Sequence, residues 1–215
     1  GVLCALGDFI TGYIHREYEA ENQLSPQEAT ILAEEYLSDF IAHLRKRLPE
    51  IERWVVLWCH GNHDRGTDKV MPSSLARRSF SWIMAHHVRS QFRHDKGVEF
   101  KIADGLHLYH DVMGHTVRVT HGDPIKYAMG IGGLTIPANR AIGAWDHGIR
   151  AKLTVHGHHH TIGDDPHRVG NGSLIGWNPF ADYIKAKPEP AAQACFVIDP
   201  EYGKRLFMPI VVQET

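Results

Sequence analysis

The residues of this chain that can do chemistry stand in short polar clusters, each directly after an apolar run. The first cluster is Gly61-Asn62-His63-Asp64, which follows the apolar residues 54–59. The second is Thr120-His121-Gly122-Asp123, and the third is Gly157-His158-His159-His160. Amides, imidazoles and carboxylates are costly to desolvate unless a cation or a substrate uses them. Three such clusters after three strand-like runs therefore predict one functional site.

The residue types in these clusters indicate a transition-metal site. Calcium and magnesium prefer oxygen ligands, whereas Mn, Fe and Zn also accept imidazole. A mixed set of carboxylate, amide and imidazole donors therefore favours two divalent transition-metal ions, Mn, Fe or Zn. The candidate ligands are Asp8, Asn62, His121, His158 and His160. Two cations about 3.5–4 Å apart can hold a hydroxide between them as the nucleophile for an in-line displacement at phosphorus, so the chemistry predicted is metal-dependent phosphoester hydrolysis.

The order of the motifs resembles that of a known family. Gly7-Asp8, residues 61–64, His121-Gly122 and residues 157–160 are similar to the motifs GD, GNH[DE], H and GHxH of the calcineurin-like metallophosphoesterases. The resemblance implies an α/β fold, a four-layer α/β/β/α sandwich in which two mixed β-sheets are flanked by helices. It also implies a dinuclear metal site on the loops.

The resemblance further implies a role for each site residue. Asp8 would bridge the two metals, Asn62, His121 and His158 would complete the protein ligands of one metal, and His160 would bind the other. His63 would be the proton donor to the leaving-group oxygen or a contact to it in the transition state, with Asp64 holding its ring.

The chain departs from the family pattern in two places. The family opens with a DxH motif on a strand before the GD motif, and nothing here matches it. We interpret residues 1–215 as a single domain lacking its N-terminal strand, because the chain begins without Met inside an apolar run. The alternative is a non-catalytic binding module of the same fold with an incomplete metal site.

The second departure concerns the subfamily. Residues 7–12 read GDFITG where phosphoprotein phosphatases have GDxVDRG, which disfavours that branch. Residues 6–15 and Asn171-Gly172-Ser173 look more like phage-associated and exonuclease-like members. With the exposed cations Arg77, Arg78, Arg89 and Arg93, this favours a phosphodiesterase or nuclease over a phosphomonoesterase. A phosphoester is the expected partner, nucleic acid included, and the sequence does not predict an oligomeric state.

Composition excludes several other classes of protein. The formal net charge of −2 over 215 residues gives no global electrostatic reason for binding nucleic acid or a membrane. No run approaches the ~20 apolar residues that a membrane span requires. The three cysteines have no CxxC spacing, so we expect buried free thiols and a cytoplasmic protein.

Several candidate residues also have ordinary structural interpretations. Asp8 alone could be a turn residue, and Asn62 could stabilise its own turn. Among the 17 histidines, His60, His156 and His159 flank the candidate ligands and are interpreted as pocket residues rather than ligands.

The elements that must position these residues follow from periodicity. Ser25-Pro26 with Glu28 predicts a capping box that opens a helix over residues 26–48. Further helices are predicted at 74–92 and 138–145, and strands at 2–6, 54–59, 98–103, 106–112, 115–120 and 151–155. Asp104-Gly105 predicts a hairpin turn between two of these strands, residues 194–198 and 205–212 predict a closing hairpin, and residues 130–133 predict a mobile loop near the site.

Overall fold

The structure, a computed structural model, describes residues 1–126, 133–183 and 188–212. The chain divides into two compact units, Gly1–Leu108 and Tyr109–Thr215. The α/β class predicted from the sequence is confirmed, since each unit has a β-sheet and accompanying helices. The stacking of four layers concerns how the units meet and stays a prediction.

The first unit is built on a parallel three-stranded sheet with the order β1-β2-β3. Its strands are β1 (Val2–Ala5), β2 (Trp54–Trp58) and β3 (Val98–Ile102). The register pairs Ala5 with Trp58, so β1 and β2 end side by side. The loops that follow them, with the GD and GNHD motifs, are therefore neighbours.

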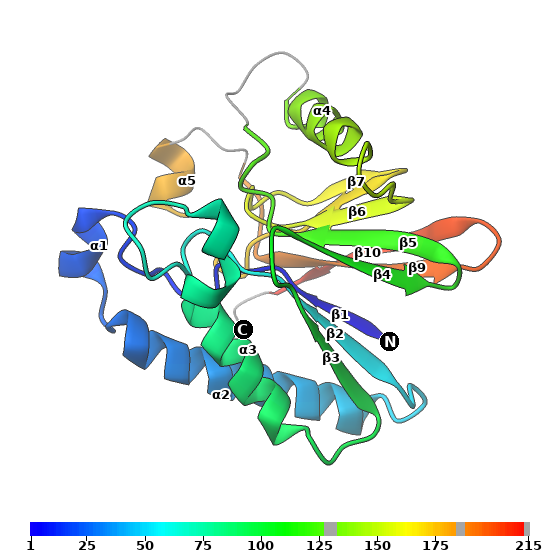
Figure 1. Ribbon diagram of the computed structural model, residues 1–215, viewed down its shortest axis with the longest axis horizontal. Coiled ribbons are helices and arrows are strands. Elements are labelled where there is room, and N and C mark those ends of the chain that lie inside the picture. Colours follow the sequence, from blue (N-terminus) through cyan, green and yellow to red (C-terminus); the bar gives the residue numbers. More distant parts are fainter. Residues whose placement is uncertain (127–132, 184–187, 213–215) are drawn as a thin grey trace. The chain divides into compact units, whose positions relative to one another are not determined.

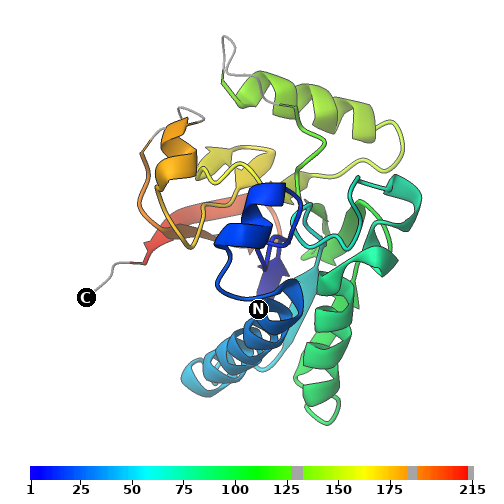
Figure 2. The same ribbon diagram turned by 90° about the vertical axis from the view of Figure 1, so that its left-hand side faces the viewer.

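Helices α2 (Pro26–Arg47) and α3 (Phe80–Gln91) lie against this sheet (Figures 1 and 2). Ser25 and Glu28 form the predicted capping box, and the helix ends one residue before the predicted Leu48. Ile41 of α2 and Met84 of α3 pack with Trp58 of β2 in the core. Each such side chain contributes about 1.5–3 kcal/mol when it is fully buried.

The predicted start of the second helix, at residue 74, is wrong. Residues 72–78 form two short 3-10 helices, η1 (Pro72–Ser74) and η2 (Ala76–Arg78), before α3 begins. The side chain of Ser79 accepts a hydrogen bond from the backbone N–H of Ser81, and this cap sets the start of α3 at Phe80. A short helix, α1 (Arg16–Glu21), was not predicted.

The second unit contains a five-stranded sheet with the order β4-β5-β6-β8-β7. Its strands are β4 (His107–Val112), β5 (His115–Thr120), β6 (Leu153–His156), β7 (Gly163–Asp165) and β8 (Arg168–Gly170). Strands β5 and β6 run parallel, with Thr120 opposite His156. The candidate residues His121 and His158 therefore follow two adjacent strand ends.

The hairpin predicted at Asp104-Gly105 is wrong. Strand β3 pairs in parallel with β2, and β4 pairs with β5 in the other sheet, so the two flanking strands do not pair with each other. The two-residue connection at Met113 and Gly114 has positive φ at both positions (55° and 83°), as a type I′ turn requires.

Helix α4 (Thr135–Trp145) lies beside the five-stranded sheet, and α5 (Pro179–Tyr183) precedes the last two strands (Figure 1). The predicted closing hairpin is confirmed as β9 (Ala192–Asp199) and β10 (Gly203–Val211), with a bulge between Arg205 and Phe207. The predicted loop at 130–133 lies outside the described residues except for Gly133.

Among the described residues, none of the helices has the length and apolar character needed to cross a bilayer. The three cysteines are free thiols, with Cys59 buried and Cys4 and Cys195 partly buried. Burial raises the pKa of the Cys4 thiol to about 12, so it is protonated at neutral pH.

Candidate functional site

The loops after β1 and β2 are in direct backbone contact, and glycine makes this possible. A Cβ added to Gly7, which has φ +89°, would lie 2.3 Å from the backbone nitrogen of Gly61. A Cβ added to Gly61 would lie 2.1 Å from both the backbone nitrogen and Oδ1 of Asp8. Any larger residue would separate the GD and GNHD motifs.

Asp64 fixes the conformation of the GD loop. Its carboxylate is fully buried, and it accepts hydrogen bonds from the backbone N–H groups of Asp8 (2.9 Å) and Phe9 (2.8 Å). It also accepts from the N–H groups of Ile10 (3.4 Å) and Gly61 (2.8 Å). These bonds hold Asp8 in the left-handed region, at φ 56°, which a non-glycine residue rarely adopts.

The ring of His63 is oriented by a backbone group. Its Nδ1 lies 2.9 Å from the backbone carbonyl of Thr11, while the carboxylate of Asp64 accepts from backbone N–H groups. That Asp64 also holds this ring stays a prediction. Because a carbonyl can only accept, Nδ1 carries a proton, and Nε2 is the atom that accepts or donates a proton elsewhere.

Asp8 and His63 are also linked directly. The backbone N–H of His63 donates to Oδ1 of Asp8 at 2.8 Å. A carboxylate has about four acceptor sites, so this bond does not exhaust its capacity to bind a cation. The link fixes the spacing between the candidate bridging carboxylate and the candidate proton donor.

Asn62 lies half-buried in a loop that Arg65 holds in place. The guanidinium of Arg65 donates to the backbone carbonyls of Asn62 (2.7 Å), Thr67 (2.9 Å) and Asp68 (3.2 Å). Arg65 thus stabilises the backbone around the GNHD motif.

The ring of His60, predicted to be a pocket residue, is buried. Its Nδ1 lies 2.7 Å from the hydroxyl of Ser81 and its Nε2 lies 2.8 Å from the carbonyl of Ala103. Burial lowers its pKa, so the neutral ring is favoured. Both ring nitrogens are already hydrogen-bonded within the first unit.

In the second unit, His121 and His158 bring two ring nitrogens together. Nε2 of His121 lies 3.2 Å from Nδ1 of His158, and the N–H of Gly157 donates to the His121 carbonyl at 2.9 Å. Two ligands of one tetrahedral cation, each bound at about 2.0–2.1 Å, would be separated by roughly 3.3 Å. The imidazole pair therefore fits a divalent transition metal.

The loop that carries His158 is tightly constrained. His158 and His160 both have positive φ, 67° and 53°. A Cβ added to Gly122, whose φ is +111°, would lie 3.2 Å from the carbonyl oxygen of Gly157. Strain of this kind is retained where the surrounding contacts impose it, often at functional sites. The exposed His160 remains a predicted ligand.

His156 and His159 support this loop. Nε2 of His159 lies 3.1 Å from the carbonyl of Ile125. Nδ1 of His156 lies 3.0 Å from the Gly157 carbonyl, and its Nε2 lies 3.3 Å from the guanidinium of Arg168. Burial lowers the pKa of His156 to about 4, and it also lowers that of His159. Both rings are therefore neutral at pH 7.

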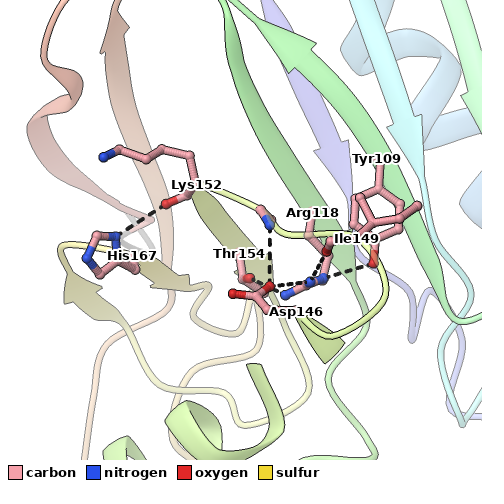
Figure 3. Close-up of polar contacts among 8 residues, drawn as sticks. Tyr109, Arg118, Asp146, Ile149, Lys152, Thr154 and His167 are labelled. Carbon is pink, nitrogen blue, oxygen red and sulfur yellow. Dashed lines mark hydrogen bonds and ion pairs between the residues drawn. The ribbon is translucent and has the colours of Figure 1, made fainter. Parts of the chain in front are cut away.

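The sequence interpretation missed a buried arginine that precedes the second cluster. Arg118 of β5 is fully buried, and its guanidinium donates to Oδ1 of Asp146 (2.6 Å) and to the carbonyl of Ile149 (2.7 Å) (Figure 3). It also donates to the hydroxyls of Thr154 and Tyr109, each at 3.2 Å. This network fixes the end of α4 to β5 and β6. A charged residue between the apolar Val117 and Val119 was the available signal.

A second missed residue is Thr11, whose carbonyl orients His63. Since any residue offers a backbone carbonyl, no residue type could have identified it.

Comparison with known proteins finds similar structures but no similar sequence. No family model matches the chain, and no curated protein matches it in sequence. Among solved structures, the chain is similar to a single mutant of vacuolar protein sorting protein 29 from Entamoeba histolytica, with a TM-score of 0.41 and 10% identity over 99% of both chains.

Two further structures are similar to this chain at 10% identity. One is a conserved uncharacterized protein, a predicted phosphoesterase, from Streptococcus pneumoniae, with a TM-score of 0.36 over 81% of this chain and 91% of that one. The other is vacuolar protein sorting protein 29 from Cryptosporidium parvum, with a TM-score of 0.33 over 60% and 77% of the two chains. We therefore base the proposed function on the residues themselves.

Proposed function

We propose that this chain hydrolyses phosphoesters with divalent transition-metal ions, and that phosphodiesters are preferred over phosphomonoesters. The observation that carries the proposal is the buried carboxylate of Asp64, which joins the GD and GNHD loops through four backbone hydrogen bonds. This network holds Asp8 in the left-handed region, at φ 56°, and backbone strain of this kind is often found at functional sites.

The proposed metal ligands are the carboxylate, amide and imidazole groups predicted from the sequence. They are Asp8, Asn62, His121, His158 and His160. The 3.2 Å separation of the ring nitrogens of His121 and His158 supports an imidazole-binding metal such as Mn, Fe or Zn. When bound, two such ions would polarise the phosphoryl group and supply an activated water at neutral pH.

His63 is the proposed proton donor to the leaving group. Its Nδ1 is hydrogen-bonded to the Thr11 carbonyl, so a proton transferred to the substrate leaves from Nε2. The bond from its backbone to Asp8 fixes its position relative to the proposed bridging ligand. General acid catalysis of this kind contributes roughly 10²–10⁴-fold to a rate.

The preference for diesters follows from the cations on the segment that includes α3. Arg77, Arg78, Arg89 and Arg93 are exposed on η2, on α3 and just after it. Cations of this kind can contact a second phosphate substituent or a nucleic-acid backbone. We accordingly include nucleic acid among the proposed substrates and place the activity in the cytoplasm.

Turnover of two aryl esters tests the proposal. The purified chain is assayed with bis(4-nitrophenyl) phosphate and with 4-nitrophenyl phosphate, each with Mn²⁺ and with excess chelator. We expect metal-dependent release of nitrophenol, faster from the diester. Release from the monoester alone would overturn the diester preference. Metal binding without turnover of either ester would indicate a binding module instead of an enzyme.

A further inference from the structure

A row of aromatic rings beside His63 has no role in the function proposed so far. The ring of Tyr18, on α1, lies 6.1 Å from the ring of His63 between centroids, tilted by 31°. The ring of His15 meets Tyr18 edge-on, with centroids 5.3 Å apart. All three rings are at least partly exposed. Together they form an aromatic row, His63-Tyr18-His15, on the surface of the first unit.

The position of Tyr18 in this row is fixed by backbone contacts. The side-chain amide of Asn22, at the end of α1, donates to the carbonyl of Gly12 at 3.0 Å. A Cβ added to Gly12 would lie 2.2 Å from the carbonyl oxygen of His63. Helix α1 is therefore held to the same backbone that carries the GNHD motif, which keeps the backbone of Tyr18 close to that of His63.

The electrostatic surroundings of Tyr18 are negative. Helix α1 carries Glu17, Glu19 and Glu21 among its six residues, with a single arginine at its start. Partial burial raises the pKa of the Tyr18 phenol first, and the charges of Glu17 and Glu21 raise it further. The phenol is thus neutral, and an anion placed on this ring would be repelled by nearby carboxylates.

We propose that Tyr18 binds the leaving group of the phosphoester, and that this group is aromatic and not anionic, which among nucleic acids admits a terminal nucleoside and not an internal polynucleotide segment. The inference rests on the proposed function. The leaving-group oxygen must come within about 3 Å of His63 Nε2 to receive its proton. With centroids 6.1 Å apart, the Tyr18 ring is within reach of the remainder of a leaving alcohol whose oxygen lies at Nε2. An aromatic substituent stacks there favourably, whereas a polyanionic one meets the glutamates.

A matched set of diesters tests the inference. Methyl 2-phenylethyl phosphate and methyl 2-cyclohexylethyl phosphate have leaving alcohols of similar acidity and size, and only one is aromatic. We expect kcat/KM for release of the larger alcohol to favour the phenyl compound by roughly two- to tenfold in the wild type. Tyr18→Phe should keep this preference, and Tyr18→Leu should abolish it.

Two controls complete the test. Tyr36→Leu removes an equally aromatic but 67% exposed side chain of α2, and it should leave the preference unchanged. A phenyl ester with a carboxylate on its ring should be a poorer substrate than the parent, and the double variant Glu17→Gln, Glu21→Gln should reduce that difference. A preference that persists in Tyr18→Leu, or equal use of the carboxylated ring by the wild type, would overturn the inference.

A binding measurement separates this inference from the proposed function. Calorimetry with 2-phenylethylphosphonate and 2-cyclohexylethylphosphonate needs no turnover. If the wild type hydrolyses none of the esters, the proposed function fails, and Tyr18-dependent binding of the phenyl compound still supports the aromatic site. If esters are hydrolysed but the two phosphonates bind equally, the aromatic site fails alone.

Discussion

At the scale of single residues, the motif glycines and the carboxylate of Asp64 depend on each other. Gly7 and Gly61 allow two backbones to touch, and Asp64 accepts the N–H groups that this contact would otherwise leave buried without partners. A carboxylate can accept several such N–H groups at once. The GNHD aspartate therefore positions the Asp8 loop.

Replacing Asp64 by Asn should destabilise the fold and disturb the Asp8 loop. An amide oxygen accepts fewer bonds than a carboxylate, and the amide N–H₂ would face backbone N–H groups. We expect the free energy of unfolding to fall by about 2–4 kcal/mol in urea titrations. Asp68→Asn, at an exposed position of the same loop, is the control. Equal stability of the two variants would contradict the positioning role.

His156 should make the metal-free protein less stable in acid. Its pKa is about 4 in the folded state and near 6.5 when unfolded. Between these values the unfolded chain binds a proton that the folded chain does not, so the free energy of unfolding falls as the pH falls. The slope from this group is at most about 1.4 kcal/mol per pH unit, and it vanishes above pH 6.5.

Urea titrations with chelator present, from pH 7.5 to 4, measure this slope. His156→Gln should show a shallower slope than the wild type, while His43→Gln, at an exposed position of α2, should match the wild type. The same slope in all three proteins would show that His156 is not buried as a neutral ring.

At the scale of elements, the sequence located most strands and the first long helix because their signals are local. The capping box at Ser25 and the apolar run of β2 need no distant partner to be recognised. The start of α3 was missed because the cap at Ser79 interrupts an otherwise helical pattern. The hairpin prediction at Asp104-Gly105 failed because the residues of a turn do not show which strands pair. Strands β3 and β4 belong to different sheets.

Arg118 is the residue on which the placement of α4 depends. Its guanidinium binds Asp146, just after the helix, and the carbonyl of Ile149. Arg118→Met should lower the free energy of unfolding by about 3–5 kcal/mol, since it leaves buried acceptors without a donor. Amide hydrogen exchange should also accelerate across Thr135–Trp145.

Arg150→Met, at an exposed position in the loop after α4, is the matched control for this change. It removes the same charge at an exposed position near the residues that Arg118 binds, and we expect almost no loss of stability. If both variants lost stability equally, the buried network would not be what fixes α4.

At the scale of the whole molecule, the proposed ligands come from both compact units, Asp8 and Asn62 from one and three histidines from the other. The sequence could propose this set because the motifs recur in a known order. It could not give the geometry of the His121 and His158 rings, which depends on the parallel register of β5 and β6.

Metal binding by the proposed ligands should stabilise the protein. At a Mn²⁺ concentration of 100 times Kd, a single site adds about 2.7 kcal/mol to the free energy of unfolding. We expect this metal-dependent increment in the wild type and in His94→Ala, an exposed control, but not in His121→Ala. For each protein the increment is the difference between the free energies of unfolding with and without metal. A lower starting stability of His121→Ala therefore does not affect the comparison. An equal increment in all three would exclude His121 as a ligand.

The most direct measurement is the rate of nitrophenol release from bis(4-nitrophenyl) phosphate by wild type, His63→Ala and His94→Ala proteins with Mn²⁺. We predict that chelator abolishes wild-type release, that His63→Ala lowers kcat by roughly 10²–10⁴-fold, and that His94→Ala matches the wild type. Release that survives the chelator, or an unchanged rate in His63→Ala, would contradict a metal-dependent phosphoesterase with His63 as its proton donor.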